Sequence, residues 1–214
     1  MAWSSLINIE SFVSVFFNWV TPKLHVTVLL ISKGVVDALD HSSPKFAVGG
    51  KLGLDCTADE IDELGISILE DNELLEKMSK ISDEVKDLKQ YFTNTKNPIT
   101  VISVDKKRNQ KHLFEDLKTL YSNLKILVIV DAKNQNDVNN PYMLLWRVVN
   151  NIDSNRDIFI DSNTICIDGT NKNSLDNFNR RWPDDVDCTK EVIDSLRQRG
   201  ILDIDDEFIK KYQL

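Results

Sequence analysis

The sequence predicts an α/β fold in which a mostly parallel sheet lies between layers of helices, a three-layer, Rossmann-like arrangement. Short apolar, β-branched runs at 24–31, 99–104 and 126–130 are typical of strands buried on both faces. Stretches with helical spacing of apolar residues separate these runs, which is the pattern of a βαβ unit with a right-handed crossover. No Pro- or Gly-rich linker divides the chain, so we expect one domain over residues 1–214.

The first third of the chain predicts two helices and two strands. Apolar residues at 6–20 indicate a buried helix, ended by Pro22 and followed by the strand at 24–31. An irregular loop then leads to a short strand at 51–55. Six apolar residues spaced three and four apart predict one helix of about five turns over 74–92: Leu74, Met78, Ile81, Val85, Leu88 and Phe92.

The remaining elements follow from cap and turn signals. Asn109 is a plausible N-cap for the helix between the strands at 99–104 and 126–130, and Pro141 suits the first position of a helix that continues through 142–152. Strands are expected at 156–160 and 164–167. Two final helices, at about 190–199 and 206–212, are separated by Gly200, which suits a C-cap.

Composition excludes several classes of protein. The formal net charge of −8 argues against a general nucleic-acid binder, which needs a basic face. Three cysteines without close spacing make neither a disulfide framework nor a zinc site, and they fit a reducing cytoplasm. The apolar stretch at 6–20 is too short and too interrupted by polar residues to span a membrane, and it has no early positive charge for a signal peptide.

The loop between the strands at 24–31 and 51–55 is the strongest candidate for a working loop or a docking surface, because long irregular loops are uncommon in compact domains. Asp37, Asp40 and His41 would suit Mg²⁺ or Mn²⁺, and nearby Lys45 and Lys51 could contact a phosphate. Asp, His and Ser are also ordinary loop residues, and composition favours that structural interpretation.

Three aspartates end predicted strands. Segments 52–57 and 165–170 share one pattern: apolar, any, apolar, Asp, any, Thr. Asp55 and Asp168 therefore end similar strands, as Asp131 ends the strand at 126–130, and we expect the three carboxylates at one edge of the sheet, where open α/β sheets bind ligands. Turn chemistry is the simpler interpretation, because Asp and Thr side chains bond the backbone that follows them.

Four stretches of the chain resemble the C-terminal domain of the UbiD family, the polyprenyl-hydroxybenzoate decarboxylases of quinone biosynthesis and their relatives. The stretches are VVDALDHSSPKFAVGGKLGLDCT (35–57), LVIVD (127–131), LLWRVVNNIDSNRDIFI (144–160) and IDGTNK…RRWPDD (167–185). The match covers about half of the chain. The resemblance implies an α/β domain packed behind a split-barrel flavin-binding domain in a homo-oligomer.

The resemblance also implies a reaction and its cofactors. Family members use prenylated FMN, with Mn and K at its phosphate, for non-oxidative decarboxylation of aromatic or unsaturated acids. Their catalytic Glu-Arg-Glu set and metal ligands lie in the barrel domain, and nothing in 1–214 reads as that barrel. We therefore assign no catalytic residue, expect no cofactor to be bound by this chain alone, and expect the chain to be inactive alone.

Several side chains are candidates for contacts in the complete enzyme. Lys51 is the candidate for facing the cofactor. The structural or interface candidates are Asp37, Asp40, His41, Trp146, Arg147, Asp168 and Trp182. We expect Trp146 to point inward and Arg147 to pair with Asp153 or Asp157.

Two alternatives stay open. One is a free-standing module that binds a nucleotide or an acidic metabolite around Asp55, Asp131 and Asp168. The other is an oligomerisation domain that uses the helix predicted at 74–92 together with the C-terminal helices.

Overall fold

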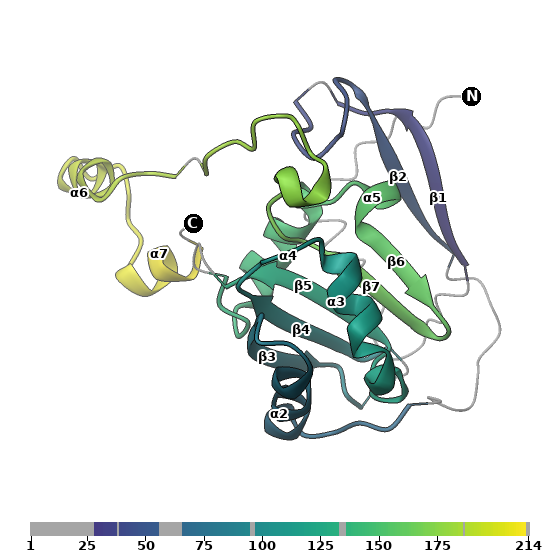
Figure 1. Cartoon of the computed structure of the whole chain (residues 1–214). Coiled ribbons are helices and arrows are strands. Elements are labelled where there is room, and N and C mark those ends of the chain that lie inside the picture. Colours follow the sequence, from purple (N-terminus) through teal and green to yellow (C-terminus); the bar gives the residue numbers. More distant parts are fainter. Residues whose placement is uncertain are drawn as a thin grey trace.

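The computed structural model describes residues 28–37, 39–55, 66–94, 97–132, 136–185 and 187–212. Within them lie a five-stranded sheet and a separate two-stranded hairpin (Figure 1). The hairpin consists of β1 (Val28–Val35) and β2 (Val48–Asp55). The predicted helix at 6–20 and the first residues of the predicted strand at 24–31 lie outside the described residues.

The five-stranded sheet is mixed, with the order β3-β4-β5-β7-β6. Its strands are β3 (Val85–Tyr91), β4 (Ile99–Val104), β5 (Ile126–Asp131), β6 (Ile158–Asp161) and β7 (Thr164–Asp168). The central strands β4, β5 and β7 are parallel, whereas the edge strands β3 and β6 pair in the antiparallel sense. The α/β class is confirmed, but a mostly parallel sheet is wrong. The cause at one edge is the two-residue turn between Asp161 and Thr164, which can join only antiparallel strands.

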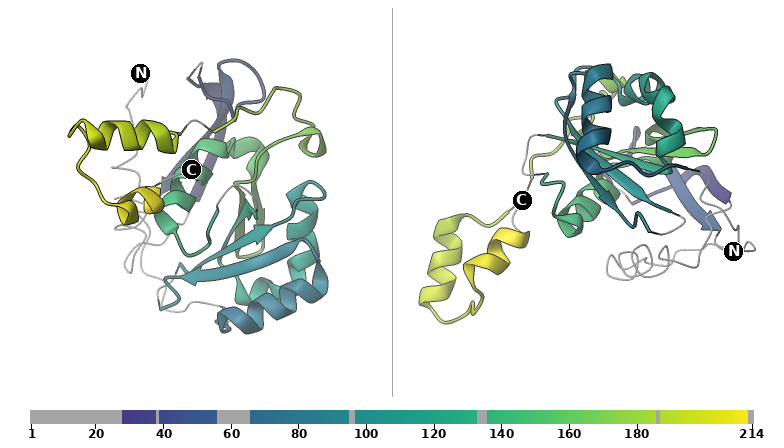
Figure 2. Two further views of the ribbon diagram at one scale, coloured as in Figure 1. Left: turned by 90° about the vertical axis from the view of Figure 1, so that its left-hand side faces the viewer. Right: turned by 90° about the horizontal axis from the view of Figure 1, so that it is seen from below.

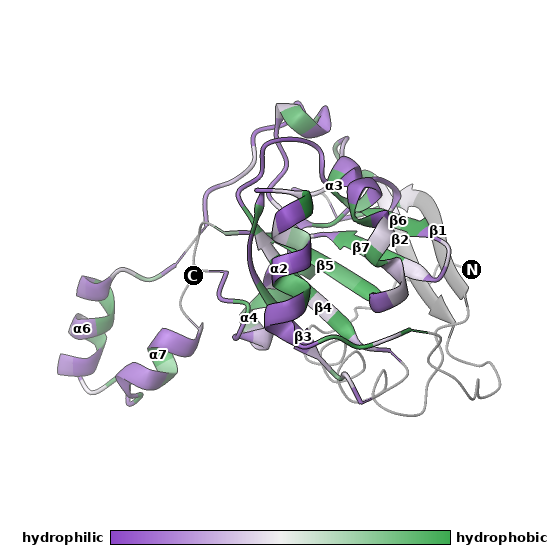
Figure 3. Cartoon of the chain, turned by 60° about the horizontal axis from the view of Figure 1, so that its bottom comes forward, coloured by the Kyte–Doolittle hydropathy of each residue, from purple (hydrophilic) through white to green (hydrophobic). Residues whose placement is uncertain are grey.

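Helices cover both faces of this sheet. One face carries α2 (Asp71–Ile81), α3 (Gln110–Asp116) and the 3-10 helix η1 (Leu117–Asn123), and the other carries α4 (Pro141–Asn151). Strand β5 shows the alternation that this requires. Leu127 and Ile129 join the core under α3, and Val128 and Val130 join the core under α4. Accordingly, the central strands consist mainly of hydrophobic residues, whereas most residues of α2 are hydrophilic (Figure 3).

The helix predicted at 74–92 is wrong in its second half, because α2 ends at Ile81 and Val85–Tyr91 is the edge strand β3. An irregularity in the β3–β4 register lies between Val85 and Asp87. Such a bulge shifts the alternation by one residue, so Val85 and Leu88 are both buried. The two buried residues are therefore three positions apart, which is also the spacing of apolar residues along one face of a helix.

Most of the remaining predicted elements are present. Asn109 caps α3 by accepting a hydrogen bond from the backbone of Lys111, and Asn140 caps α4, with Pro141 as its first residue. The strand predicted at 156–160 begins later, because one helical turn, α5 (Ser154–Asp157), precedes β6. Two more α-helices, α6 (Lys190–Gln198) and α7 (Asp206–Tyr212), follow a short 3-10 turn η2 (Ser174–Asp176), and Gly200 has a φ of 66°. Across the described ranges, every helix is too short or too polar to cross a membrane.

Cys166 lies in the core under α3, and burial raises the pKa of its thiol. We expect a thiol reagent added to the native protein to modify the exposed Cys188 and to leave Cys166 unmodified until denaturant is added. Peptide mass mapping of the labelled protein would read out each site separately. Rapid native modification of Cys166 would contradict the packing of β7 described here.

Candidate functional site

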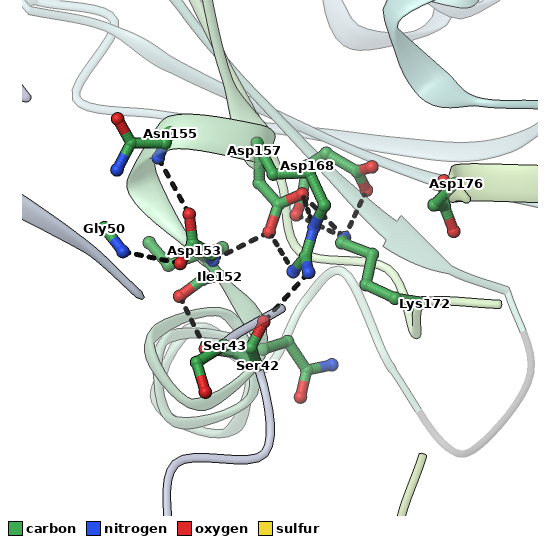
Figure 4. Close-up of polar contacts among 12 residues, drawn as sticks. Ser42, Ser43, Gly50, Ile152, Asp153, Asn155, Asp157, Asp168, Lys172 and Asp176 are labelled. Atoms are coloured by element: carbon green, nitrogen blue, oxygen red, sulfur yellow. Dashed lines mark hydrogen bonds and ion pairs between the residues drawn. The ribbon is translucent and has the colours of Figure 1, made fainter. Parts of the chain in front are cut away.

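The docked loop, residues 35–37 and 39–50, comprises the end of β1, the connection to β2 and the start of β2, and it folds back on the end of α4 and on α5 (Figure 4). The Ser42 hydroxyl donates to the backbone oxygen of Ile152 at 3.0 Å, and Arg156 donates to the backbone oxygen of Ser42 at 2.8 Å. Arg180 donates to the backbone oxygen of Ser43 at 2.7 Å. Side chains and backbone from the second half of the chain therefore hold the loop in one position.

The acidic residues of the loop organise its own turns. Asp40 Oδ1 accepts a hydrogen bond from the Ser42 backbone at 2.9 Å, and it shares the single hydrogen of the Ser42 hydroxyl, at 2.6 Å, with the backbone oxygen of Ile152. Asp37 Oδ1 accepts one from the backbone of Leu39 at 2.8 Å. The described residues contain no group of three or more His, Cys, Asp or Glu side chains that could hold a metal ion. The donors present in the loop thus fit turn chemistry and do not fit the metal site considered for Asp37, Asp40 and His41.

The two glycines of the loop allow its backbone to approach α5 closely. The Gly50 N–H donates to Asp153 Oδ2 at 2.6 Å. A Cβ on Gly50 would lie 2.5 Å from Ser154 Oγ, and one on Gly49 would lie 2.8 Å from Asp153 Oδ2. These glycines therefore serve close packing. Lys51, the candidate for facing a cofactor, follows directly and pairs through its backbone with Ser32; its side chain lies outside the described part of the structure.

Beneath the loop lies a buried ion network around α5 (Figure 4). Asp157 accepts two hydrogen bonds from Arg156 and one from the backbone of Asp153, all at 2.7 Å. Lys172 is only 2% exposed, and its Nζ lies 3.7 Å from Asp157 Oδ1 and 3.2 Å from Asp168 Oδ1. The same Nζ donates to the backbone oxygens of Asp168 and Thr170. The network connects the loop anchor Asp153 to the end of β7.

The two carboxylates that share Lys172 differ in their pKa. Burial raises the pKa of Asp157, and this effect outweighs the attraction of Lys172 and Arg156. Burial also acts to raise the pKa of Asp168, but Lys172, Lys106 and the hydrogen bonds from Thr170 outweigh it and lower that pKa. The pKa values of two buried carboxylates beside one ammonium group are expected to differ in this way, because the single positive charge compensates the second negative charge less well than the first.

The carboxyl edge of the central strands brings together two of the three predicted aspartates. Asp131 Oδ2 accepts a hydrogen bond from the backbone of Asn171 at 2.7 Å, and Asp168 Oδ1 accepts from the backbone and hydroxyl of Thr170. Burial raises the pKa of Asp131. Asp55 is elsewhere, since β2 pairs only with β1 among the described strands. The expectation of three aspartates at one edge is wrong for Asp55, and Asp168 makes the turn contacts that the simpler interpretation predicted.

The model of one known family covers this region. The C-terminal domain of 3-octaprenyl-4-hydroxybenzoate carboxy-lyase matches residues 65–194, which include the ion network and all five strands of the main sheet. The chain belongs to the UbiD family and matches its C-terminal domain. The family resemblance is thereby confirmed, and three of the four stretches, at 127–131, 144–160 and 167–185, lie within the matched residues.

Relatives and solved structures place this UbiD-family chain in context. It is 44% identical over 186 residues to an uncharacterized protein of Helicobacter pylori strain J99, a match that covers 86% of this chain and 30% of that protein. The match to the protein of strain 26695 is 43% identical with the same coverage. The chain thus spans about 30% of the length of these relatives.

Two solved structures are similar to the UbiD-family chain. One is an evolved dimeric form of the UbiD-class enzyme HmfF from Pelotomaculum thermopropionicum in complex with prFMN, with 25% identity, a TM-score of 0.41 and coverage of 53% of this chain and 26% of that one. The other is the vanillic acid decarboxylase of Sedimentibacter hydroxybenzoicus, with 18% identity, a TM-score of 0.39 and coverage of 81% and 44%.

In this UbiD C-terminal domain the Trp-Arg pair on α4 lies differently from the prediction. Arg147 is buried, and its Nη1 lies 2.5 Å from Asp185 Oδ1. Trp146 is only partly buried, with its ring 5.8 Å from the Arg147 guanidinium group. The expected partners of Arg147 are engaged elsewhere, because Asp153 holds Gly50 and Asp157 holds Arg156. Arg147 therefore fixes the segment after η2 instead of the end of α4.

His41 and Trp182 meet where the docked loop contacts the segment after η2. Their rings are 4.8 Å apart and nearly perpendicular, and His41 Nε2 lies 3.5 Å from Asn151 Oδ1. Trp182 also contacts Phe178, above which lies the Arg156 guanidinium group. The structure thus brings Asp40, His41 and Trp182 into one assembly around the loop.

Three residues that hold this assembly together had no predicted role: Arg156, Lys172 and Arg180. Each of the three lies within a stretch that resembles the family. A usable signal was present for Lys172, which follows Asp168 by four positions at the end of an apolar strand. No signal in the sequence could have paired Arg180 with a loop 137 residues earlier.

Proposed function

We propose that this chain is the C-terminal assembly and active-site-lining domain of a UbiD-type non-oxidative carboxy-lyase, and that it is inactive alone. The substrate class that we propose is an aromatic or unsaturated acid, similar to the polyprenyl-hydroxybenzoates of quinone biosynthesis. In the complete enzyme a flavin-binding barrel domain would carry prenylated FMN with Mn and K.

The observation that carries this proposal is the contrast between the two sides of the docked loop. Its buried side is held by Asp153, Arg156 and Arg180. Its outer side exposes apolar side chains that a protein surface normally covers: Val35 (74% exposed), Leu39 (89%), Phe46 (72%) and Val48 (45%). A rigid backbone with apolar side chains turned outward is typical of a surface that receives another protein body.

The alternative of a nucleotide or metabolite site at the strand ends receives less support. Asp131 and Asp168 both accept backbone hydrogen bonds from residues 170–171, and Asp168 also contacts Lys172. These carboxylates stabilise the turn after β7.

An assembly experiment tests the proposed function. The barrel segment would be the region of the Helicobacter pylori J99 relative outside the 186 matched residues, loaded with prenylated FMN and Mn²⁺. We expect this chain alone to release no CO₂ from a panel of aromatic and unsaturated acids, and to co-sediment with the barrel segment. Leu39→Asp and Phe46→Asp should abolish co-sedimentation, whereas Ile81→Asp, on the exposed end of α2, should not. Failure of the wild-type chain to co-sediment, or decarboxylation by the chain alone, would contradict the proposal.

Lys51 provides a separate prediction. Lys51→Ala should leave thermal unfolding of this chain unchanged, because the neighbouring Gly50 N–H and the β1 pairing fix the backbone. In the assembled enzyme we expect weaker assembly or faster loss of flavin, measured by co-sedimentation and by flavin absorbance after gel filtration. Lys80→Ala, on the exposed side of α2, is the matched control. Assembly and flavin retention equal to those of the wild type would remove Lys51 from the proposed interface.

A further inference from the structure

The ring of His41, in the docked loop, is held from two sides. Its Nε2 lies 3.5 Å from the side-chain oxygen of Asn151, and its ring meets that of Trp182 at 4.8 Å in a nearly perpendicular contact. The segment that carries Trp182 is itself fixed to α4 by the ion pair between Arg147 and Asp185. Contacts with the second half of the chain therefore set the orientation of the His41 ring.

The side-chain amide of Asn151 determines which nitrogen of His41 carries a hydrogen. Asn151 Nδ2 donates to the backbone oxygen of Gly169 and to Asn171 Oδ1, both at 3.0 Å. A backbone oxygen can only accept, so the amide has one allowed orientation and its oxygen faces His41. Asn151 is 3% exposed, and an oxygen buried to that extent requires a donor. The hydrogen of the His41 ring is therefore on Nε2.

The other ring nitrogen of His41, Nδ1, is then a hydrogen-bond acceptor. A neutral imidazole with its hydrogen on Nε2 keeps a lone pair on Nδ1. Within the described part of the chain no group donates to this nitrogen, and it is not enclosed in the core. His41 thus presents an acceptor that these residues leave unused.

The outer side of the docked loop indicates what supplies the donor. Helices α6 and α7 project away from the β1–β2 hairpin (Figure 2) and leave this side uncovered, with Leu39 89% and Phe46 72% exposed. This chain matches only 30% of the length of the Helicobacter pylori relatives, so those proteins contain further chain that can cover the loop. A polar acceptor among apolar side chains is costly to cover unless the covering surface donates a hydrogen bond.

We propose that His41 Nδ1 accepts a hydrogen bond from an N–H or O–H group of the flavin-binding barrel domain, and that this bond fixes the orientation in which the barrel domain seats on the docked loop. The inference rests on the proposed function and adds the residue that gives the contact its direction. Apolar contacts are non-directional, whereas a hydrogen bond to a fixed acceptor weakens steeply when the donor is misaligned.

The position of the ring hydrogen can be measured on this chain alone. Nitrogen NMR spectra of the full chain, labelled at histidine, would be recorded at a pH of about 8, above the ordinary titration range of imidazole. The His41 signals, identified by their absence in His41→Gln, should be those of a protonated Nε2 and an unprotonated Nδ1. A hydrogen on Nδ1, or rapid exchange between the two forms, would overturn the inference.

Two substitutions of His41 distinguish the acceptor role from a role in loop packing alone. The amide of His41→Gln reaches the position of Nε2, so it keeps the contact with Asn151 and loses the acceptor at Nδ1. The amide of His41→Asn occupies the position of Nδ1 and loses the contact with Asn151. In sedimentation titrations of the full chain with the barrel segment described above, we expect His41→Gln to bind about 3- to 10-fold more weakly than the wild type, the effect of one hydrogen bond. His41→Asn should bind more tightly than His41→Gln.

A role in loop packing alone would reverse the order of the two variants. His41→Asn that binds no more tightly than His41→Gln, or His41→Gln that binds like the wild type, would overturn the inference while the proposed function stands. The matched controls are His112→Gln and His112→Asn, on the exposed side of α3, which should bind like the wild type. Thermal unfolding of each variant checks that weaker binding is not loss of folding. A wild-type chain that does not bind the barrel segment would refute the proposed function itself, and the acceptor role with it.

Discussion

Replacing Lys172 by alanine is expected to lower the free energy of unfolding by about 3–5 kcal/mol, since removal of one partner leaves buried charge without compensation. Asp157 and Asp168 would then share no ammonium group, and the backbone oxygens of Asp168 and Thr170 would lose a donor. Urea unfolding of the full chain, followed by circular dichroism, measures the change. Lys77→Ala, whose pair with Glu73 is exposed, should change the stability by less than ~0.5 kcal/mol.

Two further variants distinguish the effect of losing the Lys172 charge from the effect of losing its side-chain volume. Lys172→Met keeps most of the buried side chain and should be nearly as destabilising as Lys172→Ala if the uncompensated carboxylates dominate. Adding Asp168→Asn to Lys172→Met should then recover part of the loss, because one buried charge is removed. If Lys172→Ala and Lys172→Met each lower the free energy of unfolding by less than ~1 kcal/mol, water must solvate the two carboxylates, and the network is not buried as described.

Gly50→Ala is expected to release the docked loop while the main sheet stays folded. The added methyl group would lie 2.5 Å from Ser154 Oγ and 2.7 Å from the backbone nitrogen of Asn155. Overpacking of this kind costs about 1–3 kcal/mol. We therefore expect hydrogen exchange of the loop amides to become about 10- to 100-fold faster, at roughly 1.4 kcal/mol for each factor of ten.

Hydrogen exchange read by mass spectrometry would locate the change from Gly50→Ala. Amides of β4 and β5 should keep their protection, because the sheet core does not include the hairpin. Val48→Ala alters a side chain that is 45% exposed two positions earlier and is the matched control. Loop exchange equal to that of the wild type would mean that Gly50 does not approach α5 as closely as described. Equal acceleration throughout the sheet would mean that loop and sheet unfold as one unit.

Local signals predicted the central strands and several helix starts. Strands β4 and β5 are buried on both faces and therefore read as continuous apolar runs. The caps Asn109 and Asn140 act within three residues of their helices, so a short window of sequence contains the whole signal.

The wrong predictions fall where the structure depends on contacts between residues distant in sequence or on an irregularity in strand pairing. Strand β3 carries a bulge that imitates helical spacing, and only its pairing with β4 reveals the strand. Arg147 lies closer in sequence to Asp153 and Asp157 than to Asp185, which it contacts across 38 positions. Asp55 shares a sequence pattern with Asp168, but the pairing of β2 with β1 keeps it out of the main sheet. In each case the missing information was a tertiary partner.

The contacts of the docked loop also constrain the order of folding. The bond from Ser42 to Ile152 spans 110 positions, and that from Arg180 to Ser43 spans 137. Closing such long chain loops is entropically costly and slow compared with local contacts. The loop comes early in the chain, yet it can dock only after the helical turn at 154–157 and the residues near 180 have been synthesised and have reached their native positions. During synthesis the side of the loop that carries Ser42 and Ser43 must therefore stay undocked until the later half of the chain is complete.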